Sequence, residues 1–116
     1  MENEKVFAME FGKIYPLLIA KAERKNRTKQ EVDEVICWLT GYTEKELEEK
    51  LLDNISYGQF FREAPHMNPN CEKITGSICG VKIQEIKDPL MKKIRCLDKL
   101  VDELAKGKAM EKILRK

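Results

Sequence analysis

This chain of 116 residues carries 22 basic and 20 acidic residues, for a formal net charge of +2, and 42% of its residues are hydrophobic. The length predicts a single domain over residues 1–116, because most domains contain about 100 to 150 residues and bury one hydrophobic core at that size. The low net charge argues against a dedicated nucleic-acid binder, and the 36% of charged residues argues against a membrane protein. Few glycines, prolines and aromatic residues favour a mostly helical fold.

The start of the chain and its cysteines indicate a cytoplasmic protein. Residues 1–5 lack a basic segment followed by an apolar run, so we expect no signal peptide. The four cysteines form no Cys-x-x-Cys pair, and we expect thiols that pack as small apolar side chains, without disulfides or a metal. These residues are Cys37, Cys71, Cys79 and Cys96. No cofactor and no metal site are predicted.

The first part of the chain predicts an extended segment followed by a helix. Residues 5–11 alternate loosely between two faces, and we expect a short strand or an extended arm there. Apolar residues at helical spacing then predict a helix over 12–25. Pro16 is tolerated only in the first turn, because it lacks a backbone N–H and clashes one turn back. The helix therefore begins either near Gly12 or at Tyr15.

Two capping boxes predict where the next two helices begin. Thr28 stands three residues before Glu31, and Thr43 stands three residues before Glu46. In a capping box the Thr hydroxyl accepts a hydrogen bond from the third helical N–H, and the Glu carboxylate accepts one from the cap amide. The first of these helices has a wide apolar stripe, which predicts a central place in the core, and it ends at Gly41, a typical C-terminal cap.

The middle of the chain predicts shorter elements. Residues 56–64 are expected to form a short helix with an aromatic face, and residues 68–80 a second short helix that begins at an Asn-Pro pair. Residues 81–86 alternate and predict a short strand or an extended connector. If residues 5–11 are also extended, the two segments pair as a small ribbon.

A long helix is predicted near the end of the chain, with Asp88 as its cap, Pro89 as its first residue and Gly107 at its end. Its apolar residues step by four and three, which is the spacing of a coiled-coil seam over about two heptads. The residues of this candidate seam are Leu90, Ile94, Leu97, Val101 and Leu104. The seam either packs on the chain's own core, against the helix that begins at Thr28, or joins two copies as a homodimer. A last short helical piece follows, and the elements together predict a mostly α fold: one compact domain of five or six helices with at most a short two-stranded β ribbon.

One histidine and several aromatic residues form a candidate pocket for a small ligand or an enzyme. The residues assigned to it are His66, Tyr57, Phe60, Phe61, Trp38 and Tyr42. No metal-ligand spacing or nucleophile pattern accompanies His66, so the catalytic residues stay unknown. The simpler interpretation is an exposed loop histidine and aromatic side chains that pack in the core.

Two clusters of basic residues are candidate anion-binding sites. The first consists of Lys21, Arg24, Lys25, Arg27 and Lys29, and the second of Lys106, Lys108, Lys112, Arg115 and Lys116. Cations near helix C-termini complement the helix dipole, which explains both clusters without any ligand. If the clusters converge in the fold, they can bind phosphate groups, so weak nucleic-acid binding stays open.

Several runs of the sequence are similar to a bacterial family known as domain of unknown function 2200. The runs are residues 15–17 (YPL), 21–25 (KAERK), 27–29 (RTK), 38–42 (WLTGY), 79–81 (CGV) and 97–108 (LDKLVDELAKGK). The resemblance extends from about Lys5 to Lys116 and implies a small, single-domain bacterial cytoplasmic protein. It implies no reaction, cofactor or catalytic residue. Asn26 stands where a glycine commonly precedes Arg27, and asparagine also tolerates the left-handed turn conformation.

Three functional hypotheses follow from these observations. The leading one is a non-enzymatic protein-interaction module with an unknown protein partner, or a homodimer joined through the seam. The second is a small-ligand binder or enzyme with its pocket near His66 and residues 57–61. The third is a weak nucleic-acid binder that uses the basic clusters. No membrane association is expected.

Overall fold

Seven α-helices and a small hairpin make up the described part of the chain, residues 2–78 and 80–114 of a computed structural model. The α-helices are α1 (Glu2–Ala8), α2 (Phe11–Glu23), α3 (Lys29–Thr40), α4 (Glu44–Leu52), α5 (Tyr57–Arg62), α6 (Pro89–Ala105) and α7 (Met110–Ile113). The 3-10 helices η1 (Pro69–Lys73) and η2 (Ile83–Glu85) and the strands β1 (Ser77–Ile78) and β2 (Val81–Lys82) complete these elements. The predicted mostly α fold with a short two-stranded ribbon is confirmed. None of the helices in these two ranges is long and apolar enough to cross a membrane.

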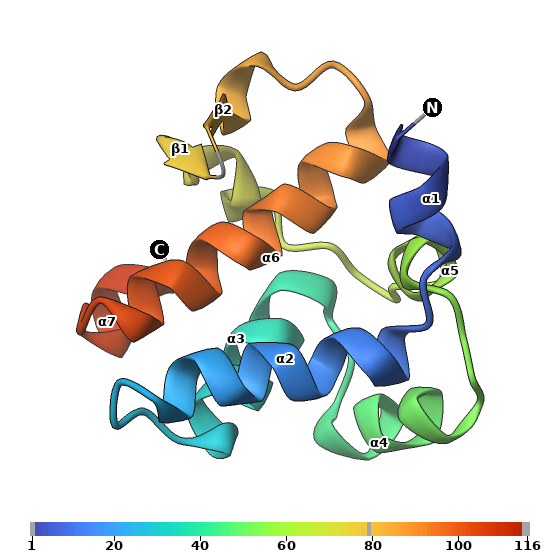
Figure 1. Ribbon diagram of the computed structural model, residues 1–116, viewed down its shortest axis with the longest axis horizontal. Coiled ribbons are helices and arrows are strands. Elements are labelled where there is room, and N and C mark those ends of the chain that lie inside the picture. Colours follow the sequence, from blue (N-terminus) through green and yellow to red (C-terminus); the bar gives the residue numbers. More distant parts are fainter. Residues whose placement is uncertain (1, 79, 115–116) are drawn as a thin grey trace.

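Helix α6 organises the molecule, because it contacts α2, α3 and α5 (Figure 1). It begins as predicted: the Asp88 carboxylate accepts hydrogen bonds from the amides of Leu90 and Met91 at 2.9 and 3.1 Å, and Pro89 is the first helical residue. Helices α2 and α6 lie side by side and run in the same direction, so their C-terminal ends lie together at the left of Figure 1. This parallel pair positions the site described below.

Helix α2 begins near the first of the two predicted starts but places its proline further inside than expected. The helix starts at Phe11, so Pro16 lies beyond the first turn. Pro16 itself is exposed on the outer side of the helix, whereas Phe11, Tyr15 and Leu18 on the inner side are buried. Burial of this inner face opposes the roughly 3 kcal/mol that an interior proline costs a helix.

Both predicted capping boxes are present. The Thr28 hydroxyl accepts from the Glu31 amide at 3.1 Å, and the Thr43 hydroxyl accepts from the Glu46 amide at 3.1 Å. Gly41 ends α3 in the left-handed conformation, with φ at 83°. A Cβ atom at this position would lie 2.6 Å from the backbone oxygen of His66, so only glycine fits both the turn and this close contact.

Residues 5–11 do not form the predicted strand or extended arm. Residues up to Ala8 belong to α1, and Glu10 alone makes an isolated bridge with Ser56. Helix α1 packs on α5 (Figure 1), where a Cβ atom at Gly58 would lie only 2.8 Å from the Cβ atom of Phe7. A pattern this short does not separate helix from strand, and the contact with α5 decides the outcome.

The predicted helix over 68–80 is wrong beyond its first turn. Asn68 caps η1 as expected, since its side chain accepts from the Asn70 amide at 2.9 Å. Gly76, with φ at 100°, then directs the chain into β1, which pairs antiparallel with β2. The ribbon therefore joins two neighbouring segments, and the strand predicted over 81–86 shortens to two residues before η2. Residue 79 lies outside the described residues.

Candidate functional site

The aromatic residues of the predicted pocket pack in the core. The rings of Phe11 and Phe60 are stacked with centroids 3.9 Å apart, and Phe61 meets Phe60 edge-on at 5.5 Å. The Tyr42 hydroxyl donates a hydrogen bond to the Phe60 carbonyl at 2.7 Å. Tyr57 is also buried, and Trp38 is half-buried against the same core. These rings fill the space between α2, α3 and α5 by contacting one another.

His66 lies apart from these rings, on the exposed loop after α5. Its backbone amide donates to the Thr40 carbonyl at 3.1 Å, and its backbone covers Gly41. The backbone of His66 thus has a structural role at the end of α3, while its imidazole is on the surface.

The candidate dimer seam faces the interior of its own chain. Leu97, Val101 and Leu104 have no exposed surface, Ile94 is 1% exposed, and Leu90 is half-buried. These side chains pack on the core of their own chain, which is the first of the two alternatives for the seam, and the homodimer stays a prediction. A second copy would reach them only if α6 left that core.

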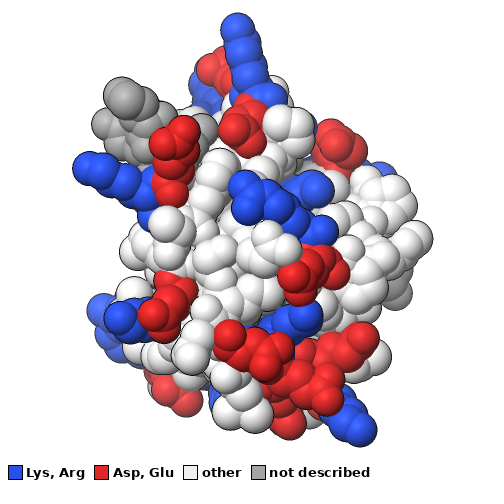
Figure 2. Space-filling model, turned by 90° about the vertical axis from the view of Figure 1, so that its right-hand side faces the viewer, with Lys and Arg blue, Asp and Glu red and all other residues white. Residues whose placement is uncertain are grey.

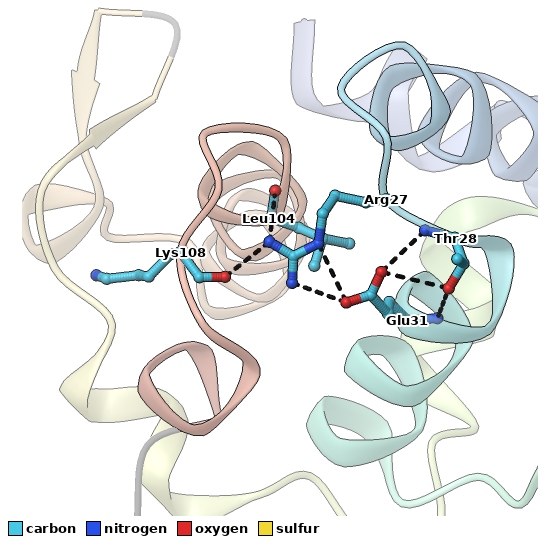
Figure 3. A network of polar contacts seen from close by, with 5 residues as sticks. All are labelled: Arg27, Thr28, Glu31, Leu104 and Lys108. Atoms are coloured by element: carbon cyan, nitrogen blue, oxygen red, sulfur yellow. Dashed lines mark hydrogen bonds and ion pairs between the residues drawn. The ribbon is translucent and has the colours of Figure 1, made fainter.

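The first basic cluster divides into two parts. Arg27 and Lys29 are engaged in structural contacts. Arg27 donates to the Glu31 carboxylate at 2.8 and 3.1 Å (Figure 3). Lys29 pairs with Asp33 at 2.8 Å. The Arg27 guanidinium also donates to the carbonyls of Leu104 and Lys108, at 3.2 and 2.9 Å (Figure 3). Arg27 therefore joins the start of α3 to the end of α6, whereas Lys29 makes its ion pair within α3.

The other three residues of the cluster, Lys21, Arg24 and Lys25, meet Lys106 of the second cluster. They line an open cavity of about 680 Å³ between the C-terminal ends of α2 and α6, together with Asp102 and Ala105. The two basic clusters thus converge in part. Lys108 and Lys112 are exposed nearby in sequence, and Arg115 and Lys116 lie outside the described residues.

Asp102 lies between cations from both helices. Its carboxylate pairs with Lys21 at 3.4 Å and with Lys106 at 3.0 Å. Burial acts to raise the pKa of Asp102, but the hydrogen bond from Lys106 and the charge of Lys21 hold this pKa below its usual range. Asp102 therefore stays ionised and fixes the positions of two ammonium groups.

A second cavity of about 390 Å³ continues the first toward the N-terminal half of α2. It is a groove between α1, α2 and α6, and it shares Lys21 and Arg24 with the basic cavity. Its apolar lining consists of Val6, Met9, Ile14, Leu17, Leu18, Ile78 and Ile94. Leu17 is 64% exposed and Met9 is 47% exposed, which are high values for large apolar side chains. We call this second cavity the α2–α6 groove.

Three polar side chains lie at the inner wall of the α2–α6 groove: Tyr57, Arg95 and Asp98. Arg95 pairs with Asp98 at 3.5 Å, and about a quarter of each side chain is exposed. Burial raises the pKa of Asp98, against the charge of Arg95. The Tyr57 hydroxyl is buried and makes no hydrogen bond with the described residues, and burial raises its pKa well above the ordinary value.

Acidic side chains gather on another part of the molecule. Figure 2 shows them at the lower edge of the face that carries α4, and α4 contains four glutamates: Glu44, Glu46, Glu48 and Glu49. In Figure 1, α4 lies at the right, whereas the basic ends of α2 and α6 lie at the left. The charge of the molecule is therefore polarised although its net charge is only +2.

The three described cysteines, Cys37, Cys71 and Cys96, form no disulfide. Among the described residues no group of three or more His, Cys, Asp or Glu side chains is placed to hold a metal ion. Burial raises the pKa of the Cys37 thiol to about 11, so this thiol stays protonated. Cys79 lies outside the described residues.

Sequence reasoning found the basic part of the site but missed its apolar part. A signal was present: Ile14, Leu17, Lys21 and Arg24 follow each other at steps of three and four along one side of α2. This side differs from the buried one, which carries Phe11, Tyr15 and Ala22 among others. Only the packed position of α6 shows that the exposed stripe borders a groove.

The comparisons with known proteins agree with this fold. A family model described as "Uncharacterized protein conserved in bacteria (DUF2200)" matches residues 5–115. The chain is similar to a crystal structure of the uncharacterized protein SP1917, with 50% sequence identity and a TM-score of 0.91. The similarity covers 96% of this chain and 91% of that chain. No curated protein matches the chain significantly.

Proposed function

The chain belongs to the bacterial DUF2200 family, and we propose that it is a binding protein whose α2–α6 groove takes the apolar part of a small molecule. The observation that carries this proposal is the groove itself, about 390 Å³ in volume, with seven apolar lining residues and a buried Tyr57 hydroxyl that has no hydrogen-bond partner among the described residues. Ligand sites commonly have volumes of about 300 to 1,000 Å³, mostly apolar walls and a few polar groups.

Two features of the groove favour an occupant. A buried hydroxyl without a hydrogen bond costs about 1–3 kcal/mol, and a ligand atom that accepts from Tyr57 removes this cost. Covering the exposed apolar surface of Leu17 and Met9 contributes about 25 cal/mol of favourable binding free energy for each Å² that a ligand buries. The proposal agrees with the small-ligand hypothesis from the sequence in its class of function, and it moves the site from His66 to the groove, with Tyr57 in common.

A neutral apolar fluorophore tests this function. N-phenyl-1-naphthylamine becomes brighter in an apolar site, and we expect saturable binding of one molecule per chain. Leu17→Gln is expected to weaken this binding about tenfold, the equivalent of ~1.4 kcal/mol of lost apolar contact. Leu17 is exposed, so the substitution does not disturb the core.

Leu52→Gln is the matched control, because Leu52 is 82% exposed on α4 and does not line the groove. It should leave binding of the fluorophore unchanged. Fluorescence that does not saturate, or an equal loss in the two variants, would show that the α2–α6 groove is not the site.

A protein-interaction module is the second candidate, since Leu17 and Met9 extend apolar surface to the rim of the groove. A partner protein, a homodimer and a cytoplasmic location all stay predictions. Light scattering after size exclusion separates the candidates: a monomer at all concentrations favours the small ligand, whereas a dimer that Leu17→Glu dissociates favours self-association through the rim.

A further inference from the structure

The apolar groove and the basic cavity form one continuous furrow. Lys21 and Arg24 line both, so a single ligand can reach from one to the other. On α6 the furrow extends from Ile94 to Lys106, which is about 18 Å at 1.5 Å per helical residue. The two ends differ in chemistry: Met9 and Val6 lie at the apolar end, and Lys25 and Lys106 lie at the basic end.

The basic end carries more positive charge than the protein itself neutralises. Four cations, Lys21, Arg24, Lys25 and Lys106, line it against the single carboxylate of Asp102. The C-terminal ends of α2 and α6 add roughly half a negative charge each, so about two positive charges stay uncompensated at this end. The helix dipoles therefore do not account for the whole cluster.

Two of these cations are open to a ligand. In the ranges that the structure describes, neither Arg24 nor Lys25 forms an ion pair with a carboxylate, and both are exposed. The Arg24 Nε donates to the Ala20 carbonyl at 3.3 Å, and this contact leaves the other guanidinium nitrogens available. Lys21 and Lys106 are held beside them by Asp102, at 3.4 and 3.0 Å.

We propose that the occupant of the α2–α6 groove is an anionic amphiphile, with its carboxylate or phosphate group between Arg24, Lys25 and Lys106 and its hydrocarbon part along Leu17 and Met9. This inference rests on the proposed function and adds the class of ligand. The continuous furrow favours a single small molecule over a nucleic acid, which would place a long polyanion across the apolar half and near the acidic α4.

Displacement of N-phenyl-1-naphthylamine by matched competitors tests the proposal. Decanoate and decyl phosphate carry the anion, and decanol has the same chain without a charge. Both anions should displace the fluorophore at about tenfold lower concentration than decanol at low salt, the equivalent of ~1.4 kcal/mol. Added salt should narrow this difference, because the basic end is exposed to solvent.

Charge variants locate the anion. Arg24→Glu should abolish the preference for decanoate over decanol, and it should fold normally because Arg24 is exposed. Lys106→Gln should reduce the preference, and its loss of the Asp102 pair makes an unfolding curve part of the experiment. Lys45→Gln is the matched control, since Lys45 is an exposed cation on α4 and should leave the preference unchanged.

The outcomes separate the inference from the proposed function. Saturable fluorophore binding with equal displacement by decanoate and decanol overturns the anionic ligand and leaves the groove as a binding site. No fluorophore binding and no displacement overturns both. Association with phosphatidylglycerol vesicles, without displacement by monomeric decanoate or decyl phosphate, also overturns the proposal, because the anion would then belong to a membrane surface.

Discussion

Arg24 and Arg27 lie three residues apart in one basic run, but they belong to regions with different roles. Arg27 is mostly buried, with 15% of its side chain exposed, and donates to Glu31 and to the carbonyls of Leu104 and Lys108 (Figure 3). Arg24 is exposed and lines the α2–α6 groove. The Arg27 guanidinium forms hydrogen bonds that hold two helices together, whereas the Arg24 guanidinium is exposed to solvent.

The difference between these regions comes from the end of α6. The last carbonyls of a helix have no intrahelical partner, and a nearby arginine can satisfy more than one of them. Arg27 reaches the carbonyls of Leu104 and Lys108 from the turn before α3, whereas Arg24 is still on α2, which runs beside α6. The same type of charge is therefore structural at one position and available at the other.

The largest expected effect comes from the core side of α6, the helix that both regions share. Leu97 is fully buried on α6. Leu97→Ala should lower the free energy of unfolding by about 2–5 kcal/mol, because it removes apolar contacts and leaves a cavity. Urea unfolding measures this loss, and Leu52→Ala, on the exposed side of α4, should stay within about 0.5 kcal/mol of the original chain. Similar losses in the two variants would contradict this assignment of the core.

The next effect tests the comparison directly. Arg27→Ala should cost about 2–3 kcal/mol of stability, since it removes charge-assisted hydrogen bonds and leaves partners at the end of α6 unsatisfied. Arg24→Ala should change stability by no more than about 0.5 kcal/mol. Urea unfolding of the two variants under one buffer checks both values. Equal losses would mean that Arg24 is structural as well.

A smaller effect concerns the capping boxes. Thr28→Ala and Thr43→Ala should each cost about 1 kcal/mol, because each removes the acceptor at the start of its helix. Thr28 shares Glu31 with Arg27, so Thr28→Ala combined with Arg27→Ala should depart from additivity by about 0.5 kcal/mol or more. The stability losses of Thr43→Ala and Arg27→Ala should be additive. Coupling in this second pair would contradict the view that Arg27 acts only with the first capping box.

The smallest effect is a pH dependence with opposite signs in the two regions. The Arg27 guanidinium and the Thr28 amide lower the pKa of Glu31 from its ordinary 4.5, so this carboxylate contributes stability above that pH and loses it as the pH falls through the folded-state pKa. Arg27→Gln should therefore lower the free energy of unfolding by less at about pH 3 than at about pH 6.

Asp98 has the opposite pH dependence. Burial raises the pKa of Asp98, so its contribution to stability falls as the pH rises through that pKa.

Asp98→Asn measures the second sign. It removes the cost of ionising a buried carboxylate, so its stability relative to the original chain should improve as the pH rises from about 3 to about 6. Urea unfolding at several pH values gives both trends. Parallel pH curves for Arg27→Gln and Asp98→Asn would contradict the opposite pKa shifts.

The sequence predicted elements whose causes lie within a few residues. The capping boxes at Thr28 and Thr43, the Asp88–Pro89 start of α6 and the left-handed Gly41 were all found, because each depends on hydrogen bonds or backbone angles inside one turn. The prediction of a strand or extended arm over residues 5–11 was wrong for the opposite reason. Their helix depends on packing against α5, about fifty residues later in the chain.

The candidate site divides in the same way. The basic residues at positions 21–29 were visible in the sequence, together with the possibility that two clusters converge. Their separation into Arg27 and Lys29 on one side and Lys21, Arg24 and Lys25 on the other was not visible, because it depends on where α6 ends. The aromatic residues of the predicted pocket show the converse, since their helical spacing did not tell a pocket from a packed core.

The amino-acid sequence by itself determined that this protein is mostly helical and where most of its long helices begin and end, because capping, helix propensity and apolar spacing act over about four residues. Tertiary structure alone decided which faces of those helices were left uncovered. The α2–α6 groove exists because two segments about eighty residues apart pack in parallel, and their side chains do not fill the space between them.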